Sequence, residues 1–151
     1  MPLLARRCAS EELADALLLV AGMFRDLGTA SIPESWPADA ERALRGRSDD
    51  VVGVFVTVDN NRIVAVAFGL IEQRLPSPRR PDGRIGYVEW LATSKEDRRR
   101  GAARLAMQAL MTWYDQHGLR VVDVHASVAA APLYRELGFA EPASIPMRWL
   151  A

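Results

Sequence analysis

The feature that most constrains the fold is a predicted strand, a loop and a long helix that follow one another past the middle of the chain. Residues 84–93 have the composition of a strand, and residues 102–117 place apolar side chains along one helical face up to a stop at Gly118. The loop between them contains the run Arg-Arg-Arg-Gly-Ala-Ala at residues 98–103. The first turn of a helix has backbone N–H groups without intrahelical partners and carries partial positive charge. This arrangement therefore predicts an anion site made chiefly of main chain.

The other elements, read from hydrophobic periodicity and turn residues, alternate strands and helices around this central unit. A helix is expected over residues 10–27, with Ser10 as its N-cap. A hairpin is expected to turn at Asn60 and Asn61, because asparagine tolerates positive φ. The predicted order is β-α-α-β-β-β-α-β-α-β, a mixed α/β plan. The remaining expected elements are a strand over 3–8, a helix over 34–45, hairpin strands over 51–59 and 62–72, a loop over 75–83, a strand over 121–126, a short helix ending at Gly138 and a strand over 147–150.

Composition narrows the class of protein. The 151 residues are half apolar and a quarter charged, which fits one globular domain over residues 1–151. Nineteen basic side chains balance nineteen acidic ones, so no general affinity for nucleic acid or for an anionic membrane is expected. One cysteine and two histidines argue against a disulfide framework and against a metal site. The short apolar runs predict neither a signal peptide nor a membrane span, so we expect a cytoplasmic protein.

Two motifs give the chain a resemblance to a known family. The segment from Leu91 to Ala103 resembles strand four, the acyl-CoA loop and helix three of the GNAT superfamily, whose signature is Arg/Gln-x-x-Gly-x-Gly/Ala. The segment from Pro132 to Phe139 resembles the family's second motif, Leu-Tyr-x-x-x-Gly-Phe. The resemblance implies the α/β acyl-CoA acyltransferase fold, with a mixed, mostly antiparallel sheet of six to seven strands and about four flanking helices. It also implies an N-acetyltransferase that uses acetyl-CoA, without a metal, to acylate a primary amine of a small molecule or peptide.

Carried over position by position, the resemblance implies where the cosubstrate binds. Leu91, Ala92 and Thr93 would hold the pantetheine arm through strand-like backbone hydrogen bonds. The loop would hold the pyrophosphate, chiefly through backbone amides, while its arginines add charge-assisted contacts. Ser127 stands where relatives often have asparagine, and its shorter side chain either bonds the cofactor arm or caps the following helix. The loop residues concerned are Arg98, Arg99, Arg100, Gly101, Ala102 and Ala103.

Two residues are candidates for accepting the proton that an attacking amine must lose, because a primary amine with a pKa near about 10 is mostly protonated at neutral pH. Glu89, on the strand face that Leu91 is expected to share, is similar to the acid that many relatives use as a general base. An acid in a strand otherwise made of apolar and aromatic side chains is locally unfavourable, which favours a functional interpretation over an ordinary strand carboxylate. His125 is the other candidate base, with a structural histidine as the competing interpretation.

The departing thiolate of CoA needs a proton or a hydrogen bond. Tyr134 matches the tyrosine that the family places beside the sulfur, and a neutral phenol can donate that proton. The competing interpretation is a core tyrosine that packs a short helix. We therefore take Glu89 and Tyr134 as the candidate catalytic pair.

The sequence says less about the identity of the amine acceptor and of the binding partners. The segment over residues 30–45, in which Trp36 stands out, and the loop over 75–83 are the expected sources of acceptor specificity. Polyamine, antibiotic, amino acid, peptide N-terminus and protein lysine all stay open as acceptors. The alternative function is an acyl-CoA-binding regulator or sensor without transfer activity. A homodimer is expected by analogy, formed through the strand from Met147.

Overall fold

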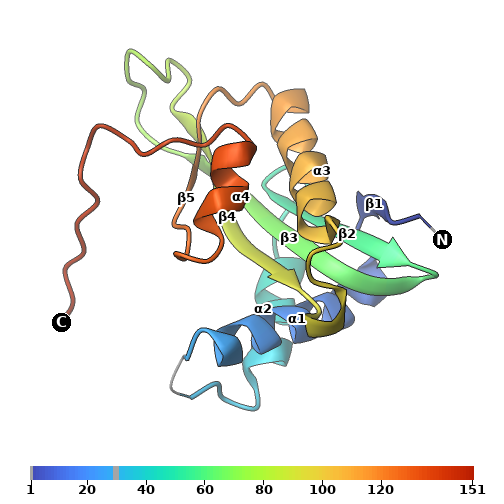
Figure 1. The fold of residues 1–151 in the computed structure, drawn as a ribbon. Coiled ribbons are helices and arrows are strands. Elements are labelled where there is room, and N and C mark those ends of the chain that lie inside the picture. The colour runs from blue at the N-terminus through green and yellow to red at the C-terminus, as the bar shows by residue number, and fades with distance from the viewer. Residues whose placement is uncertain (1, 29–30) are drawn as a thin grey trace.

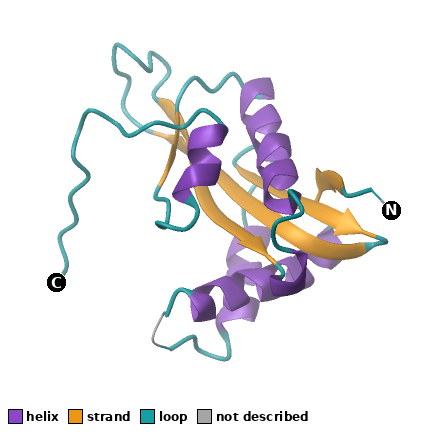
Figure 2. Cartoon of the chain, viewed as in Figure 1, coloured by secondary structure: helices purple, strands orange, loops and turns teal. Residues whose placement is uncertain are grey.

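The computed structural model describes residues 2–28 and 31–151. Within them one sheet carries helices on both faces (Figure 1, Figure 2). The elements in chain order are β1 (Leu4–Arg7), the 3-10 helix η1 (Ser10–Glu12), α1 (Leu13–Asp26), α2 (Trp36–Arg45), β2 (Val52–Asp59), β3 (Arg62–Gln73), β4 (Arg84–Thr93), the 3-10 helix η2 (Lys95–Asp97), α3 (Ala102–Gln116), β5 (Val122–Val124) and α4 (Ala131–Glu136).

The sheet has the strand order β1-β2-β3-β4-β5, and every neighbouring pair is antiparallel except β4 and β5, which run parallel. β2 and β3 form the predicted hairpin, and Asn60 and Asn61 have φ values of 49° and 67° as their turn requires. The parallel pairing is short, because only residues 86–88 of β4 pair with residues 122–124 of β5. The outer edge of β4 over residues 89–93 is therefore left without a neighbouring strand.

Each face of the sheet is covered by its own helices. α1 and α2 cover one face, and α3 covers the other with α4 beside it (Figure 1). Burial of apolar side chains on both faces is the main stabilisation of this three-layer arrangement. Buried residues on the α1 face include Leu17, Val20, Val66 and Phe68, and those on the α3 face include Phe55, Met107, Leu110 and Tyr114.

Glycines in the sheet allow the close approach of α3, and Gly69 is the tightest of them. A Cβ on Gly69 of β3 would lie 2.3 Å from the hydroxyl oxygen of Tyr114, so no larger residue fits at this position without displacing the helix. The close approach lets the Tyr114 hydroxyl donate a hydrogen bond to the Tyr87 carbonyl oxygen at 2.7 Å. The helix is thus tied to β4, the strand that precedes the predicted anion site.

Two expectations about the elements need correction. The predicted strand over residues 147–150 is wrong, and the sheet has five strands where six to seven were expected. A strand needs a neighbour for its backbone hydrogen bonds, and no described strand lies beside residues 140–151 in this chain. The strand expected over residues 121–126 is shorter for the same reason, because β5 pairs with β4 only over residues 122–124.

Ser10 does not cap the first long helix. The backbone N–H of Ala9, before η1, donates to the Glu12 carboxylate at 2.9 Å, and no described side chain caps the start of α1. Ser10 instead accepts a hydrogen bond from the Arg45 guanidinium at 2.7 Å, which joins η1 to α2. The mixed α/β architecture itself is confirmed, and so is the predicted order of its elements as far as α4.

Candidate functional site

The predicted anion site lies at the N-terminus of α3, where the loop after β4 turns into the helix. Arg99 and Gly101 have positive φ values of 64° and 79°, and no side chain caps the helix at Gly101. Among the described residues, the N–H groups of residues 101–104 donate no hydrogen bond, and the helical bonding starts with the Leu105 N–H donating to the Gly101 carbonyl oxygen at 3.1 Å. Free donors at the positive end of a helix dipole form a site for an anion.

A buried hydroxyl fixes the start of α3 on the sheet. Thr57 of β2 is fully buried, and its hydroxyl donates to the carbonyl oxygen of Ala102 at 2.7 Å. The free amides of the first turn are therefore held in place rather than left to fray. They face a cavity of about 220 Å³ that is lined by Thr93, Asp97, Arg98, Arg99, Gly101, Ala102, Ala103, Arg104 and Leu133.

The arginines of the loop differ in what they contact. Arg98 pairs with Asp26 of α1 at 2.7 Å, and Arg104 pairs with Glu136 of α4. Arg100 pairs with two carboxylates, those of Asp59 and Asp97. Of these loop arginines, Arg99 is the one whose guanidinium has no ion pair among the described residues. The loop therefore offers an anion the backbone amides and one uncommitted arginine.

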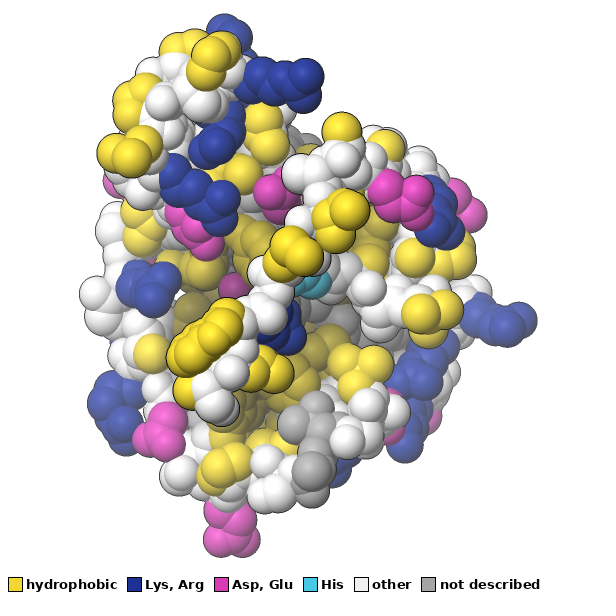
Figure 3. Space-filling view, turned by 90° about the vertical axis from the view of Figure 1, so that its left-hand side faces the viewer, with side chains coloured by type: hydrophobic (Ala, Val, Ile, Leu, Met, Phe, Trp, Pro, Cys, Tyr) yellow, Lys and Arg dark blue, Asp and Glu magenta, His cyan; other side chains and the backbone are white. Residues whose placement is uncertain are grey.

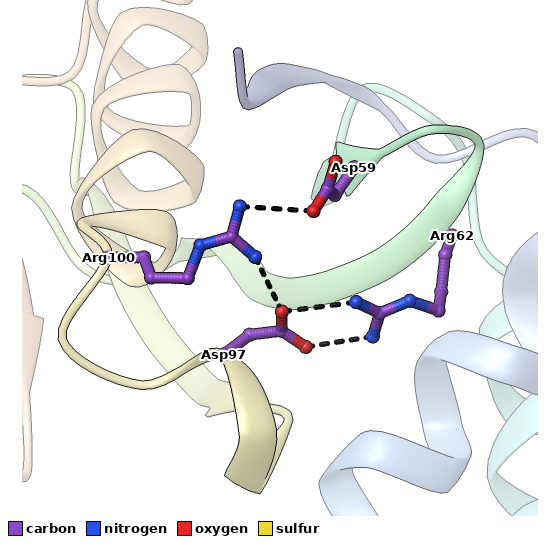
Figure 4. A network of polar contacts seen from close by, with 4 residues as sticks. All are labelled: Asp59, Arg62, Asp97 and Arg100. Carbon is purple, nitrogen blue, oxygen red and sulfur yellow. Dashed lines mark hydrogen bonds and ion pairs between the residues drawn. The ribbon is translucent and has the colours of Figure 1, made fainter. Parts of the chain in front are cut away.

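A buried carboxylate network holds this loop in shape (Figure 4). Both oxygens of Asp97 accept from Arg62 of β3, at 2.8 and 3.1 Å, and one of them also accepts from Arg100 at 2.7 Å. Arg100 reaches on to Asp59 at 3.0 Å. The Arg62 guanidinium is the main cause that lowers the pKa of Asp97 from 3.8 to about 2. Asp97 was not predicted, because an acid in the run Lys-Glu-Asp-Arg has the composition of a solvated turn.

Glu89 lies at an irregularity of β4. Trp90 pairs with Phe68 of β3 and Val88 pairs with Gly69, so Glu89 is an extra residue without a partner in β3. Such a β-bulge redirects side chains locally. The structure consequently separates Glu89 from Leu91: Leu91 packs against the α3 cluster, whereas Glu89 lines a cavity on the face covered by α2.

The cavity at Glu89 has a volume of about 180 Å³ and lies between α2 and strands β2, β3 and β4. The Glu89 side chain is exposed as a whole, but partial loss of hydration at the carboxylate raises its pKa above the ordinary value. The negative charge of Glu72 raises that pKa further, while Arg47 lowers it. A carboxylate with a raised pKa is suited to accept a proton near neutral pH.

An aromatic cluster adjoins this cavity. The rings of Phe24, Trp36 and Trp90 contact one another edge to face, with centroid separations of 5.4, 5.5 and 6.1 Å, and Phe68 contacts Trp90 at 5.2 Å. Trp36, predicted to influence acceptor choice, is thereby placed in the same cluster as the neighbour of Glu89. The loop between α1 and α2 also contains residues 29 and 30, which lie outside the described residues.

The residues predicted to hold the pantetheine arm lie along the open edge of β4. Leu91, Ala92 and Thr93 pair on one side with Ala67, Val66 and Ala65 of β3, and their other side faces the gap where β5 no longer pairs. Ala92 is buried among the α1 cluster, and Thr93 lines the cavity at the start of α3. The edge thus leads from the bulge at Glu89 toward the anion site.

Tyr134 and Ser127 line a separate cavity of about 480 Å³. Tyr134 is buried, its ring contacts Phe139 with centroids 5.5 Å apart, and burial raises its pKa to about 12. Its hydroxyl has no hydrogen-bond partner within residues 2–28 and 31–151, so it remains a free donor. Ser127 accepts from the Ala130 N–H at 3.2 Å, so it caps the turn into α4. Glu89 and Tyr134 line different cavities, and Tyr134 lies on the α3 side of the sheet.

Tyr87 lies between these two candidates and was not singled out from the sequence. The negative charge of Glu89 contributes to the raised pKa of Tyr87, after burial as the first cause, and Tyr87 in turn contributes to the raised pKa of Tyr134. The Tyr87 ring contacts the exposed His125 edge to face, with centroids 5.6 Å apart. The position of Tyr87, two residues before the unusual acid Glu89, is the sequence signal that could have indicated it.

These features define a class of protein. A mixed sheet in which β4 separates from β5, followed by a helix with free main-chain donors at its start, is the architecture of an acyl-CoA-dependent acyltransferase. The chain belongs to the acetyltransferase (GNAT) family, because the model of that family matches residues 21–139. Membership makes it an acyl-CoA-dependent N-acyltransferase.

Solved structures share this fold over the whole chain. A predicted acetyltransferase from Clostridium acetobutylicum, solved with acetyl-CoA, has a TM-score of 0.84 at 18% identity and covers 99% of this chain and 95% of its own. The aminoglycoside acetyltransferase AAC(6')-Iy, solved with a bisubstrate analogue, has a TM-score of 0.80 at 14% identity, and the match covers 100% of this chain and 99% of its own. Glucosamine-6-phosphate N-acetyltransferase from Arabidopsis thaliana has a TM-score of 0.74 at 16% identity, and the match covers 100% of both chains. A search of curated proteins finds no match.

No group of three or more histidine, cysteine, aspartate or glutamate side chains that could bind a metal ion occurs in residues 2–28 and 31–151. No helix of the described chain has the length and apolarity needed to cross a membrane.

Proposed function

We propose that this chain is a single-domain cytoplasmic N-acetyltransferase that transfers an acetyl group from acetyl-CoA to a primary amine of a small molecule or peptide. The observation that carries the proposal is the set of free amides at residues 101–104, held at the positive end of α3 beside an open strand edge. An elongated cosubstrate with a diphosphate at one point and an amide-bearing arm fits both features. The fold neighbours that were solved with acetyl-CoA and with a bisubstrate analogue support this choice.

In this proposal the diphosphate lies in the cavity at the start of α3. The amides of residues 101–104 donate to its oxygens, and Arg99 adds a charge-assisted contact. The pantetheine arm then follows the open edge of Leu91, Ala92 and Thr93 toward the point where β4 and β5 separate. Arg98 and Arg100 contribute their backbone and hold the loop through their ion pairs.

Glu89 is the proposed general base. The acceptor amine approaches from the α2 face, where Glu89 lines its cavity beside Trp90. The amine nitrogen attacks the thioester carbonyl, so the C–N bond forms while the C–S bond breaks, and the amine proton passes to Glu89 directly or through a water. The raised pKa of Glu89 brings its proton affinity closer to that needed near neutral pH. Aminoglycoside and glucosamine-6-phosphate acetyltransferases among the fold neighbours support an amine acceptor.

Tyr134 is the proposed general acid for the departing thiolate, because its hydroxyl is neutral, buried and not engaged by another described residue. Tyr134→Phe removes only the hydroxyl, and we expect kcat to fall by about tenfold or more while the acetyl-CoA dissociation constant stays unchanged. Steady-state kinetics and calorimetry measure the two quantities. An unchanged kcat would remove Tyr134 from the mechanism.

The cosubstrate site can be tested with a matched pair of glycines at the two ends of α3. Gly101 and Gly118 have φ values of 79° and 74°, and a Cβ at either one meets nothing within 4 Å. We expect Gly101→Asp to weaken acetyl-CoA binding by at least about tenfold, because its carboxylate would repel the diphosphate at short range. Gly118→Asp should leave binding unchanged, although it is the harsher change for folding because it places negative charge at a helix C-terminus.

Calorimetric titration with acetyl-CoA measures the affinity of both variants, and circular dichroism checks that each is folded. Equal affinities in Gly101→Asp and the natural chain would show that the diphosphate binds elsewhere. Release of free CoA thiol across a panel of aminoglycosides, amino sugars, polyamines and peptides then separates an enzyme from an acyl-CoA-binding regulator. Binding without thiol release from any of these amines would favour the regulator.

A further inference from the structure

The cavity at Glu89, which we call the acceptor cavity, is lined by one free charge of each sign. Its ionisable lining residues are Glu89 of β4 and Arg47, which follows α2. Both side chains are exposed, and neither forms an ion pair or a hydrogen bond with a residue that the structure describes. The nearby carboxylate of Glu72 is instead paired with Arg74 at 2.9 Å. The charges available to a ligand in this cavity are therefore those of Glu89 and Arg47.

Arg47 is held beside the acceptor cavity by the end of α2. Its backbone N–H donates to the Leu44 carbonyl oxygen at 3.0 Å, so the chain keeps a helical turn beyond the last residue of the helix. The positive charge of Arg47 lowers the pKa of Glu89, in opposition to burial and to the charge of Glu72. The two free charges thus act on each other across the cavity, and a ligand between them interacts with both.

A larger cavity of about 430 Å³ adjoins the acceptor cavity, and Arg47 lies in the wall of both. Two further arginines line the larger cavity, but their guanidinium groups already have partners. Arg45 binds the Glu41 carboxylate at 2.7 Å, and Arg7 donates to the Val52 carbonyl oxygen at 3.0 Å. Arg47 is thus the arginine that an anion can reach here without displacing a described partner.

The charge of an acceptor has to be recognised by such individual groups. The chain has equal numbers of basic and acidic residues, and on the face shown in Figure 3 the two kinds are interspersed. No broad field therefore attracts a polycation or a polyanion to the molecule. The acceptor cavity, about 180 Å³, is smaller than the roughly 300–1,000 Å³ of pockets that enclose drug-sized ligands. It accommodates the amine-bearing end of an acceptor and the groups next to it.

We propose that the acceptor is an amine that also carries a carboxylate or a phosphate, and that Arg47 binds this anionic group while Glu89 receives the amine. This inference rests on the proposed acetyl transfer at Glu89. A molecule with an ammonium group and an anionic group matches the two free charges of the acceptor cavity, and both groups form charge-assisted hydrogen bonds there. A polyamine directs a second positive charge toward Arg47, which repels it.

Two pairs of amines that differ in the anionic group provide the test. L-Leucine is compared with L-leucinamide, and glucosamine 6-phosphate with glucosamine, by the release of CoA thiol. We expect kcat/KM of at least one anionic member to exceed that of its partner by about tenfold or more. The leucine pair is stringent, because the amine of leucinamide is less basic and loses its proton more easily. The pair that shows the preference identifies the anion as a carboxylate or a phosphate.

Substitution of Arg47 assigns the preference to this residue. Arg47→Gln should abolish the preference, because glutamine has no charge for the anion, while kcat/KM of the partner without the anion stays unchanged. Arg47→Glu should reverse the preference. Arg42→Gln is the matched control, since it removes an exposed arginine of α2 that lines neither cavity, and it should retain the preference. A preference that survives in Arg47→Gln would overturn the proposal.

Binding measured without turnover separates this inference from the proposed reaction. Ligand-observed NMR on the complex with CoA, which carries no acetyl group, compares the affinity of each anionic amine with that of its partner. Glu89→Gln should keep the preference for the anion, and Arg47→Gln should lose it. Preferential binding without thiol release would contradict acetyl transfer and support the anion site at Arg47. Thiol release without preferential binding of either anionic amine would support the transfer and overturn the anion site.

Discussion

Replacing Glu89 with glutamine is expected to lower kcat for amine acetylation by about 100-fold or more while leaving acetyl-CoA affinity unchanged. Glutamine keeps the size of the side chain and its place in the bulge of β4, but it cannot accept the amine proton. In the proposed binding mode acetyl-CoA contacts the start of α3 and the edge of β4 at Leu91, Ala92 and Thr93, and the change replaces none of these residues. Stopped-assay kinetics with a saturating amine, together with calorimetry, separate the two effects.

The pH dependence gives the same experiment a second readout. The natural enzyme should lose activity as pH falls through the raised pKa of Glu89, because the protonated carboxyl cannot act as a base. Glu89→Gln should lack this acidic limb. Glu72→Gln is the sharper control: removing a charge that raises the Glu89 pKa should move the limb to lower pH without abolishing activity. An acidic limb that survives in Glu89→Gln but vanishes in His125→Gln would transfer the role to the histidine.

The second large effect is expected from Asp97→Asn. The side-chain amide of asparagine cannot accept hydrogen bonds from both arginines as the carboxylate does. Arg62 and Arg100 would therefore lose their shared partner. Breaking such a network costs about 3–5 kcal/mol when all partners are buried, and we expect about 2 kcal/mol here because the arginines are half-exposed. The Tm should fall by about 6 °C. Affinity for acetyl-CoA should fall by about tenfold, since the loop at the start of α3 loses its anchor.

Thermal unfolding and calorimetry check both parts of this prediction. Asp39→Asn, which removes an exposed pair with Arg42 on α2, is the control and should leave stability nearly unchanged. The pKa of Asp97 is lowered on folding, so its contribution to stability is complete above its ordinary value of 3.8 and is lost as pH falls toward about 2. The stability difference between the natural chain and Asp97→Asn should therefore shrink across this range. A difference that is constant from pH 5 to pH 2 would contradict the network's role.

The sequence predicted those parts of the fold whose signals are local. The strand over 84–93, the turn at Asn60 and Asn61 and the helix after Gly101 each depend on periodicity or on residues that tolerate positive φ, and all three are present. The free amides at the start of α3 follow from these elements, because every helix leaves its first donors unpaired. These elements could therefore be predicted without knowing which distant residues contact one another.

The remaining features depend on pairings between distant residues. The bulge at Glu89 becomes visible only once β4 is set in register with β3, and a regular alternation wrongly put Glu89 on the same face as Leu91. Asp97 is buried because Arg62, thirty-five positions earlier, lies beside it. The pattern over 147–150 is that of a strand, but whether a strand forms depends on a neighbour that the pattern does not contain. In each case composition gave the local preference and tertiary contact decided the outcome.

The ion pairs of Arg98, Arg100 and Arg104 have a consequence for discrimination among anions. Because carboxylates already neutralise most of the positive charge around the first turn of α3, the site exerts little long-range attraction on polyanions in general. An anion gains binding energy only by reaching the amides themselves, at hydrogen-bonding distance and with oxygens spaced to match them. Long-range attraction therefore contributes little to selection at the proposed anion site, and contact with the amides contributes more.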